Sequence, residues 1–283
     1  MRVCVVGAGR MGARVALRGA QRGCETIVVA RSVERARASL EAAADEIDER
    51  SALEGITIRD DLSAIASAQF VYEAIPEILS EKQRLFSELE AFIDDHVPIV
   101  SGTSTFFPDK LGFYLEFPKR VFVAHFVHPV TLCPLAEIVE PSADVDRFAA
   151  ATLDAWIEKL ALEPIRLSKP LPGFIINRLQ FAMLREALHI VEKGGATAEE
   201  VDTIVRLGLG PRWTATGPIE SIALGGPATF ADVAHSVVPT LDNRERIPLI
   251  EEPGESLPSP DAARRRRASD ARKRAYLFAR ELR

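Results

Sequence analysis

The chain opens with Arg2-Val3-Cys4-Val5-Val6-Gly7-Ala8-Gly9-Arg10-Met11-Gly12, in which a short apolar run leads directly into a glycine-rich turn. The run is typical of a buried parallel strand, and residues 13–22 are expected to form a helix. Between strand and helix, Gly7 permits a tight turn, Gly9 lets the backbone approach a pyrophosphate, and Gly12 lets the helix pack closely. The turn therefore predicts a dinucleotide site, with a purely structural glycine-rich turn as the alternative. The cofactor-binding residues expected here are Gly7, Gly9, Arg10, Met11 and Gly12.

The end of the second expected strand, residues 26–30, bears on the type of dinucleotide. An NAD site usually has an acidic residue there for the ribose 2′-hydroxyl, whereas this chain has Arg31 and Ser32. A guanidinium and a hydroxyl would bind a 2′-phosphate, which a carboxylate would repel. We therefore expect NADP(H) rather than NAD(H). The alternative is that Arg31 stacks on the adenine of NAD(H).

Strand and helix signals alternate up to about residue 168, and from Pro172 onward only helical signals remain. Further strands are expected at 56–58, 70–75, 98–101, 121–124, 135–140 and 164–167, with a helix at 145–160. This pattern predicts an α/β fold with a doubly wound Rossmann sheet domain over residues 1–170. Helical stretches at 173–192, 198–207, 218–224, 228–237 and 260–282 predict a smaller all-α domain over residues 171–283. Residues 244–259 are expected to form an exposed connection.

The composition argues against several classes of protein. The net charge is −6, which argues against a nucleic-acid role, and hydrophobic residues form 47% of the 283 positions, enough for a large core. The arginine run 264–267 is expected on the solvated side of a helix with one apolar face. No apolar run reaches the ~18 residues of a membrane span. The chain begins with an expected core strand, which argues against a signal peptide.

The cysteines indicate the compartment. Cys4, Cys24 and Cys133 are an odd, sparse set with apolar neighbours, as expected of reduced thiols in a cytoplasmic protein. No cluster of His, Cys and carboxylate residues has the spacing of metal ligands, so we expect no metal.

A histidine and a glutamate form a candidate catalytic pair. His125 follows the apolar residues 121–124, and Glu137 lies inside the apolar stretch 135–139. The two side chains can meet across neighbouring strands, where a carboxylate on one imidazole nitrogen makes the other nitrogen a general base near neutral pH. The alternative is a buried histidine that only satisfies a structural hydrogen bond.

Five motifs together resemble a known family. They are Gly7-Ala8-Gly9-Arg10-Met11-Gly12, Tyr72-Glu73-Ala74-Ile75-Pro76-Glu77, Ser101-Gly102-Thr103-Ser104, His125-Phe126-Val127-His128-Pro129-Val130 and Pro172-Gly173-Phe174-Ile175-Ile176-Asn177-Arg178-Leu179. In this order and spacing, the chain resembles the 3-hydroxyacyl-CoA dehydrogenase superfamily over nearly its whole length. The similarity is greatest to the lambda-crystallin branch, which includes L-gulonate 3-dehydrogenase and has carnitine 3-dehydrogenase as a near relative.

The resemblance implies roles for four residues in catalysis. His125 matches the catalytic histidine, and Glu137 matches the glutamate that orients it. Ser104 matches the serine that binds the reacting oxygen of the substrate. Asn177 matches the asparagine that completes the site from the first helix of the second domain. The structural alternatives are a turn or cap residue for Ser104, a hydrogen bond within its helix for Asn177 and, for Glu77 of the second motif, a charge at a helix N-terminus.

The resemblance also implies residues at the nicotinamide end of the cofactor. Glu77 and Lys82 match residues beside the nicotinamide ribose. His128 stands where the family usually has Asn next to the nicotinamide, so it can still donate a hydrogen bond but its charge can vary with pH. Gly102 also replaces a common Asn. With Arg31, these are the departures that concern cofactor geometry.

Two segments bear on the substrate. CoA-type members have a long lysine-rich helical hairpin that contacts CoA, whereas residues 41–50 here are short and acid-rich. The segment Gly208-Leu209-Gly210-Pro211-Arg212-Trp213 resembles the lambda-crystallin and carnitine branches. There Arg212 would clamp a substrate carboxylate and Trp213 would form a pocket wall. Alternatively, Arg212 is a charge at a helix end or a dimer interface.

The sequence thus favours an enzyme that transfers hydride between NAD(P)(H) and a 3-hydroxy or 3-oxo acid. One alternative is the same reaction on an acyl-CoA or carrier-protein thioester. Another is a non-catalytic, crystallin-like protein that binds a cofactor. From the family we also expect a homodimer through the helical domain.

Overall fold

The computed structural model describes residues 1–142, 144–247, 268, 270–276 and 278. The chain divides into two compact units, Met1–Asn177 and Arg178–Arg283.

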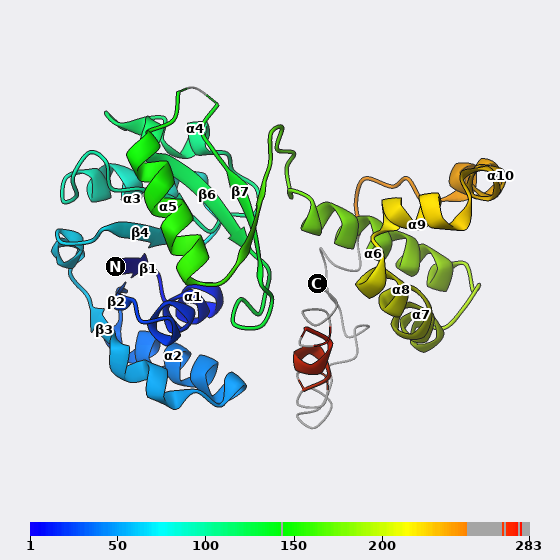
Figure 1. The fold of residues 1–283 in the computed structure, drawn as a ribbon, viewed down its shortest axis with the longest axis horizontal. Coiled ribbons are helices and arrows are strands. Elements are labelled where there is room, and N and C mark those ends of the chain that lie inside the picture. Colours follow the sequence, from blue (N-terminus) through cyan, green and yellow to red (C-terminus); the bar gives the residue numbers. More distant parts are fainter. Residues whose placement is uncertain (143, 248–267, 269, 277, 279–283) are drawn as a thin grey trace. The chain divides into compact units, whose positions relative to one another are not determined.

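The first unit is built on one sheet of eight strands, in the order β3-β2-β1-β4-β5-β6-β7-β8 (Figure 1). All neighbouring strands are parallel except β6 and β7, which are antiparallel. The chain leaves β1 toward β2 and β3 on one side and returns to β4 on the other, which makes the β1–β4 boundary the switch point of a doubly wound sheet. The strands are Arg2–Val6 (β1), Glu25–Val29 (β2), Ile56–Arg59 (β3), Phe70–Glu73 (β4), Ile99–Ser101 (β5), Val121–Phe126 (β6), Leu135–Val139 (β7) and Glu163–Arg166 (β8).

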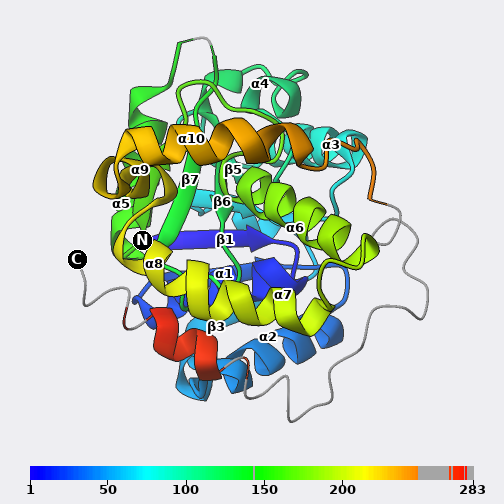
Figure 2. The ribbon, with the colours of Figure 1, turned by 90° about the vertical axis from the view of Figure 1, so that its right-hand side faces the viewer.

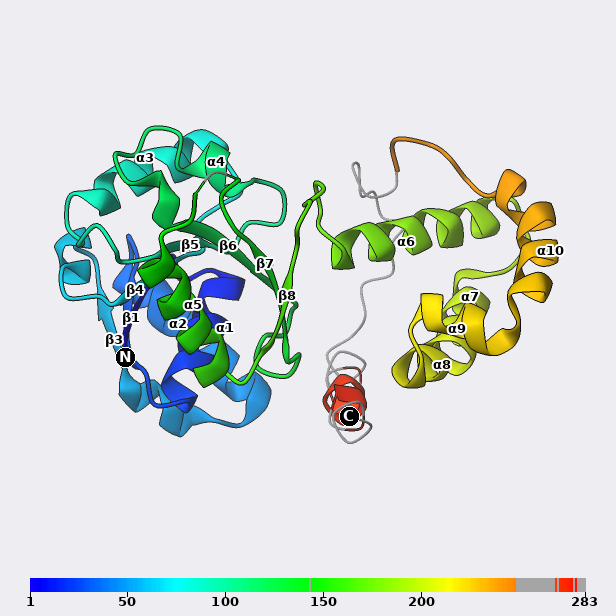
Figure 3. The same ribbon diagram turned by 45° about the horizontal axis from the view of Figure 1, so that its top comes forward.

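Helices cover both faces of this sheet (Figure 3). They are α1 (Arg10–Gln21), α2 (Val33–Ile47), α3 (Leu79–Glu90), α4 (Pro108–Leu111) and α5 (Arg147–Lys159), with 3₁₀ turns at Arg50–Gly55, Leu62–Ile65 and Pro118–Arg120. Residues of α1, α2 and α5 share one apolar core, and residues of α3 and α4 share a second. Val3 and Val5 belong to the first core and Cys4 and Val6 to the second, so β1 is buried on both faces. This is why the opening run is apolar throughout rather than alternating.

Trp156 of α5 forms the centre of the first core. It is fully buried and lies 4.1 Å from Phe70, ring centre to ring centre, and 5.6 Å from both Tyr72 and Phe126. These aromatic contacts fix α5 across β4 and β6, the strands whose ends carry much of the site.

The second unit is helical in its described part (Figure 2). The elements are α6 (Ile176–Glu192, which begins within the first unit), α7 (Ala198–Ile204), a π-helical turn (Val205–Leu209), α8 (Gly210–Ala215), α9 (Pro218–Gly225), α10 (Pro227–Val237) and a 3₁₀ turn (Val238–Thr240). Helix α7 begins with a capping box, in which Thr197 and Glu200 satisfy each other's backbone N–H groups. No described helix of the chain is long and apolar enough to cross a membrane.

The predicted fold class, a Rossmann sheet domain followed by a helical domain, is confirmed. The differences are local. The helix predicted at 173–192 begins at Ile176, because Gly173 and Phe174 have φ of +81° and +50°. Helix α8 was not predicted, because glycines and a proline crowd its start, yet Pro211 is accepted in its first turn.

The domain boundary at residue 170 stays a prediction, while the first compact unit extends to Asn177. Of the predicted helix 260–282, residues 270–276 are helical. Residues 268 and 278 are helical as well, and the remaining residues of that helix, with most of the predicted connection 244–259, lie outside the described residues.

Candidate active site

The glycine-rich turn after β1 has a backbone that other residues would not fit. Gly7 has φ +100°, and a Cβ there would lie 2.7 Å from the carbonyl oxygen of Ala74. A Cβ on Gly12 would collide with the carbonyl of Gly7, whereas a Cβ on Gly9 would meet nothing within 4 Å. The first helix therefore packs tightly on the turn, while Gly9 leaves the approach to the helix N-terminus open.

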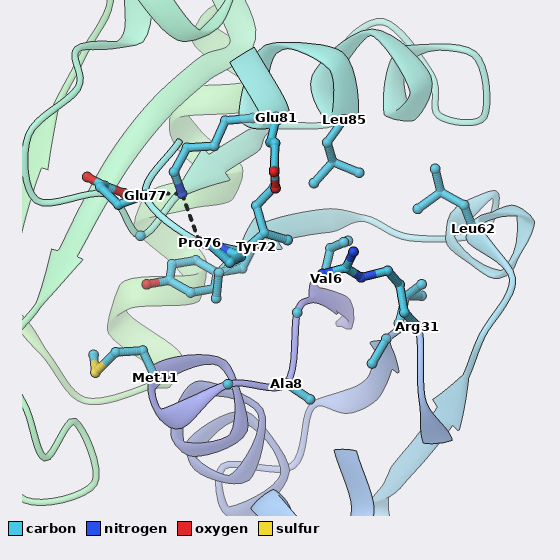
Figure 4. A pocket seen from close by; sticks show the side chains of 18 of the residues that line it. Val6, Ala8, Met11, Arg31, Leu62, Tyr72, Pro76, Glu77, Glu81 and Leu85 are labelled. Carbon is cyan, nitrogen blue, oxygen red and sulfur yellow. Dashed lines mark hydrogen bonds and ion pairs between the residues drawn. The ribbon is translucent and has the colours of Figure 1, made fainter. Parts of the chain in front are cut away.

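A pocket of about 670 Å³ extends from this turn (Figure 4). Its lining includes Gly7 to Met11, the end of β2, and residues 74–77 after β4. In Figure 4 Arg31 and Glu77 lie at opposite ends of it. The first turn of α1 has no acidic side chain that would compete for its free N–H groups. An elongated pocket at the switch point, with an open helix N-terminus at its centre, fits a dinucleotide with its pyrophosphate at α1.

At the β2 end of the pocket, the two residues expected to bind a 2′-phosphate behave differently. Arg31 is exposed and lines the pocket together with Asp60. Ser32 is the N-cap of α2. Its hydroxyl accepts from the N–H of Arg35 at 3.2 Å and donates to the carboxylate of Glu34 at 3.1 Å. The Ser32 hydroxyl is thus engaged by its own helix. Of these two residues, only Arg31 is left to bind a 2′-phosphate.

The other end of the pocket rests on a buried ion pair. Lys82, in the first turn of α3, donates from Nζ to Glu73 Oε1 at 2.6 Å and to the carbonyl of Ile75 at 3.2 Å, and lies 3.3 Å from Glu77 Oε2. Glu73 and Lys82 are 0% and 1% exposed. A cation at a helix N-terminus is electrostatically unfavourable. The two carboxylates offset that cost, and together with the carbonyl of Ile75 they provide a partner for each of the three donors of the ammonium group.

Glu73 is a site residue that the sequence analysis missed. Its other oxygen accepts from the hydroxyl of Ser101 at 2.5 Å, and its first oxygen also accepts from the N–H of Ile75. Burial raises the pKa of Glu73 above its usual range, and the ion pair and hydrogen bonds oppose that rise. The signal was available, because a carboxylate that ends an apolar strand has to find partners inside the protein.

The candidate catalytic pair is in contact. His125 of β6 and Glu137 of β7 are direct partners in the antiparallel ladder, and His125 Nδ1 lies 2.8 Å from Glu137 Oε2. The Glu137 side chain is 2% exposed and that of His125 12% exposed. The histidine ring also packs 5.5 Å from the ring of Phe174. With Nδ1 bound to a carboxylate, Nε2 is the nitrogen left for a ligand.

The second oxygen of Glu137 is bound where α6 begins. Glu137 Oε1 accepts from the N–H groups of Ile175 at 2.7 Å and Ile176 at 3.1 Å. Burial alone would raise the pKa of Glu137. The hydrogen bonds from His125 and from these two N–H groups outweigh burial and hold the pKa below its usual range. Asn177 is the next residue of the helix, which places it beside the carboxylate that orients His125.

The other predicted site residues lie on three segments. Ser104 follows β5, whose last residue, Ser101, pairs with Val123 of β6, two residues before His125. His128 follows β6, in a segment whose Thr131 carbonyl accepts from the buried Arg18 at 3.2 Å. Arg212 and Trp213 lie on α8 of the second unit. The first unit therefore gathers His125, Glu137 and the Ser104 and His128 segments at the carboxyl edge of one sheet.

The structure gives a physical reason for Gly102. A Cβ there would collide with the hydroxyl of Tyr72, which is fully buried and donates to the carbonyl of Ala124 at 3.4 Å. Tyr72 thus occupies the space that a side chain at position 102 would need, and the two residues have to be considered together.

A dinucleotide pocket on a doubly wound sheet, with an imidazole–carboxylate pair on the same sheet edge, defines the class of nicotinamide-dependent dehydrogenases. The family description "3-hydroxyacyl-CoA dehydrogenase, NAD binding domain" matches residues 2–170, and the C-terminal domain of the same family matches residues 173–252. The chain belongs to the 3-hydroxyacyl-CoA dehydrogenase family. It is an oxidoreductase that transfers hydride between NAD and a CH–OH group.

Individual relatives agree with this assignment. The chain is 32% identical to an L-carnitine dehydrogenase of Oceanobacillus iheyensis over 234 residues, which cover 80% of this chain and 76% of that one. It is 31% identical to a human lambda-crystallin homolog, with 81% and 77% of the two chains covered. A solved 5-formyl-3-hydroxy-2-methylpyridine 4-carboxylic acid 5-dehydrogenase has the same fold, with a TM-score of 0.86, 24% identity, and 99% and 98% of the chains covered.

Within the part of the chain that the structure describes, no group of three or more His, Cys, Asp or Glu residues is arranged to hold a metal ion.

The lowered pKa of Glu137 predicts a pH-dependent effect of the Glu137→Gln substitution. The ionised carboxylate is stabilised in the folded state, so its contribution is present above the unfolded pKa of about 4.3 and is lost as the pH falls through the folded pKa. At pH 7 we expect the variant to lose about 1–3 kcal/mol of unfolding free energy, because the Gln amide cannot accept all three hydrogen bonds. Urea unfolding of both proteins from pH 7 to 3 measures the difference, which should shrink toward pH 3. A constant difference would contradict the assignment.

Proposed function

We propose that the protein interconverts a 3-hydroxy acid and its 3-oxo acid, with His125 as general base in oxidation and general acid in reduction. The observation that supports this most directly is the 2.8 Å contact between His125 Nδ1 and the buried Glu137 carboxylate. The carboxylate favours the tautomer with the proton on Nδ1 and stabilises the imidazolium that forms when Nε2 takes a proton.

The chemistry divides between the cofactor and the chain. NAD(H), when bound, accepts or supplies the hydride. His125 Nε2 removes the proton of the substrate hydroxyl as the hydride leaves, and returns it in the reverse direction. Ser104 and Asn177 are neutral donors for the oxygen on which negative charge develops. The buried Glu137 cannot exchange its role with His125, because both of its oxygens already accept hydrogen bonds.

A free acid is the substrate class we favour over a thioester. The acid-rich residues 41–50 form the end of α2 and the start of the following 3₁₀ turn. Two of these acidic residues form ion pairs, Glu46 with Arg14 and Asp45 with Arg50. Both arginines are therefore already paired with carboxylates, and the surface is poorly suited to bind the phosphates of CoA. Arg212 on α8 supplies a guanidinium suited to a substrate carboxylate, and Trp213 a wall beside it. The likeness to an L-carnitine dehydrogenase supports the same class.

His125→Ala tests the reaction. We expect turnover to fall by about 10²–10⁴-fold, because the general base is removed, while the affinity for NADH stays within about twofold. Initial rates with L-carnitine, L-gulonate and 3-hydroxybutyrate, and with 3-hydroxybutyryl-CoA, measure the effect, with cofactor fluorescence as the binding control. Unchanged turnover in the variant would remove His125 as the base.

The same panel of substrates separates the alternatives. Greater activity on the thioester than on every free acid would replace the free-acid proposal by the acyl-CoA one. Arg212→Ala should lower the rate on free acids and leave the rate on the thioester unchanged. A native protein that binds NADH but turns over no member of the panel would favour the crystallin-like, non-catalytic alternative.

A preference for NADP(H) over NAD(H) is the finer cofactor proposal, and it rests on Arg31. Its guanidinium is exposed at the β2 end of the pocket, where a 2′-phosphate would lie. Asp60 in the same lining, and Glu34 beside Ser32, place negative charge nearby, so the preference should be modest.

Arg31→Ala should weaken NADPH binding about tenfold, since a hydrogen-bonded charge pair with the phosphate is lost, and leave NADH binding almost unchanged. Titration of the fluorescence of both cofactors at equal salt measures the ratio of the two dissociation constants. If that ratio is the same in the native protein and the variant, Arg31 does not discriminate between NADPH and NADH.

We also propose that the protein is a homodimer through the helical unit. Among the described residues of this unit, many large apolar side chains are exposed, including Leu207, Ile219 and Leu224 at 76%, 83% and 70%. So much exposed apolar surface exceeds what a soluble monomer usually carries, and a second copy of the chain would cover it.

Light scattering of the purified protein at micromolar concentration should give twice the 31.0 kDa mass of one chain. Ile219→Glu should shift the mass toward that of one chain, because it places a charge in the proposed interface. Lys110→Glu, on α4 of the first unit, is the control for added negative charge. A native mass of one chain would contradict the dimer.

A further inference from the structure

The segment that carries Ser104 has no regular secondary structure, so something else has to hold it. Residues 102–107 lie between β5 and α4 outside any helix or strand. The Thr103 hydroxyl accepts from the N–H groups of Thr105 at 3.2 Å and Phe106 at 3.1 Å, which closes a turn around Ser104. This turn is local and by itself does not fix the position of Ser104 relative to the sheet.

One carboxylate binds this turn at three successive residues. Glu77 Oε1 accepts from the hydroxyl of Thr103, from the N–H of Ser104 at 3.2 Å and from the hydroxyl of Thr105 at 2.7 Å. Three donors from three consecutive residues thus converge on a single oxygen atom. Such hydrogen bonds to a charged acceptor are stronger than those between neutral groups.

The other oxygen of Glu77 lies against Lys82, and both residues belong to the lining of the cofactor pocket. Glu77 Oε2 lies 3.3 Å from the buried Lys82 ammonium, the side chain is 38% exposed, and the residue is part of the pocket lining. Burial alone would raise the pKa of Glu77. The hydroxyls of Thr103 and Thr105 and the charge of Lys82 hold it below its usual range, so the group is ionised at neutral pH.

We propose that Glu77 couples the cofactor pocket to the substrate end of the site, and that Thr103 and Thr105 are positioning residues that act through it. The proposal rests on the proposed function, because it gives Ser104 its role at the substrate oxygen. One oxygen of the carboxylate lies against Lys82 in the lining of the cofactor pocket, while the other accepts a hydrogen bond from the backbone of Ser104. Occupation of the pocket therefore restrains the carboxylate, and the carboxylate restrains Ser104.

Positioning of Ser104 through Glu77 has different measurable consequences from a purely structural role of Thr103 and Thr105. If the Oε1 contacts are weakened, Oε2 and Lys82 still offer the pocket the same charge, so cofactor affinity should persist. Ser104, in contrast, should lose its fixed position, and the reaction should slow without a change in cofactor binding. A structural defect would instead lower stability and both kinds of binding together.

Thr105 offers a matched pair of substitutions, because it is exposed and the fold does not depend on its packing. Thr105→Val removes the hydroxyl and keeps the shape, whereas Thr105→Ser keeps the hydroxyl. We expect Thr105→Val to lower kcat/KM about tenfold, the effect of one hydrogen bond to a charged group, with the NADH dissociation constant within about twofold. Thr105→Ser should retain native kinetics.

A second readout needs no substrate. Ser104→Cys introduces a thiol whose reaction with a thiol reagent reports how firmly the segment is held. The native cysteines Cys4, Cys24 and Cys133 are buried, and the native protein gives their background rate. In the Ser104→Cys background, Thr105→Val should speed labelling about tenfold relative to Thr105→Ser.

The outcomes distinguish this proposal from the proposed function. Equal labelling rates for the Val and Ser variants, or loss of NADH binding in step with kcat/KM, would overturn the coupling through Glu77. If the native protein turns over none of the tested 3-hydroxy acids, the free-acid function fails, and the labelling rates still decide whether Glu77 holds Ser104.

Discussion

The buried ion pair between Glu73 and Lys82 is the interaction on which the carboxyl edge of the sheet depends. Removing two charges from water is costly, and such a pair persists only where further hydrogen bonds satisfy both groups. Here each donor of Lys82 and each oxygen of Glu73 has a partner, and the partners lie on β4, β5, α3 and the loop 74–78 that joins β4 to α3. The pair therefore ties three elements together at the point where the pocket ends and the Ser104 segment begins.

Much of this architecture could be predicted from the sequence, because its causes are local. Strand β1 is apolar from Val3 to Val6 since both of its faces are buried, and Gly7 and Gly12 stand where a Cβ would collide with backbone. The contact between His125 and Glu137 followed from their spacing across two expected strands. Family motifs added Glu77 and Lys82, which the structure also brings together.

What could not be predicted depends on distant pairings or on backbone geometry. The partnership of Glu73 with Ser101 requires that β4 and β5 be neighbours, which periodicity does not reveal. The engagement of Ser32 by its own helix competes with ligand binding and appears only once the cap is formed. From the sequence, Gly102 is only a position where a common Asn is absent. The structure shows that the hydroxyl of Tyr72 occupies the space that a side chain at position 102 would need.

The antiparallel pairing of β6 with β7 sets a rule for how the sequence can change. His125 and Glu137 are opposite each other in the ladder, and side chains alternate between the two faces of a strand. A slip of β7 by one residue would present Ala136 or Ile138 to the histidine and turn the carboxylate to the opposite face. A residue inserted into or deleted from β7 ahead of Glu137 would break this pairing, whereas a change of length in the loop 127–134 would keep the pairing but displace His128. In a lineage of such proteins, the length of β7 should therefore stay constant.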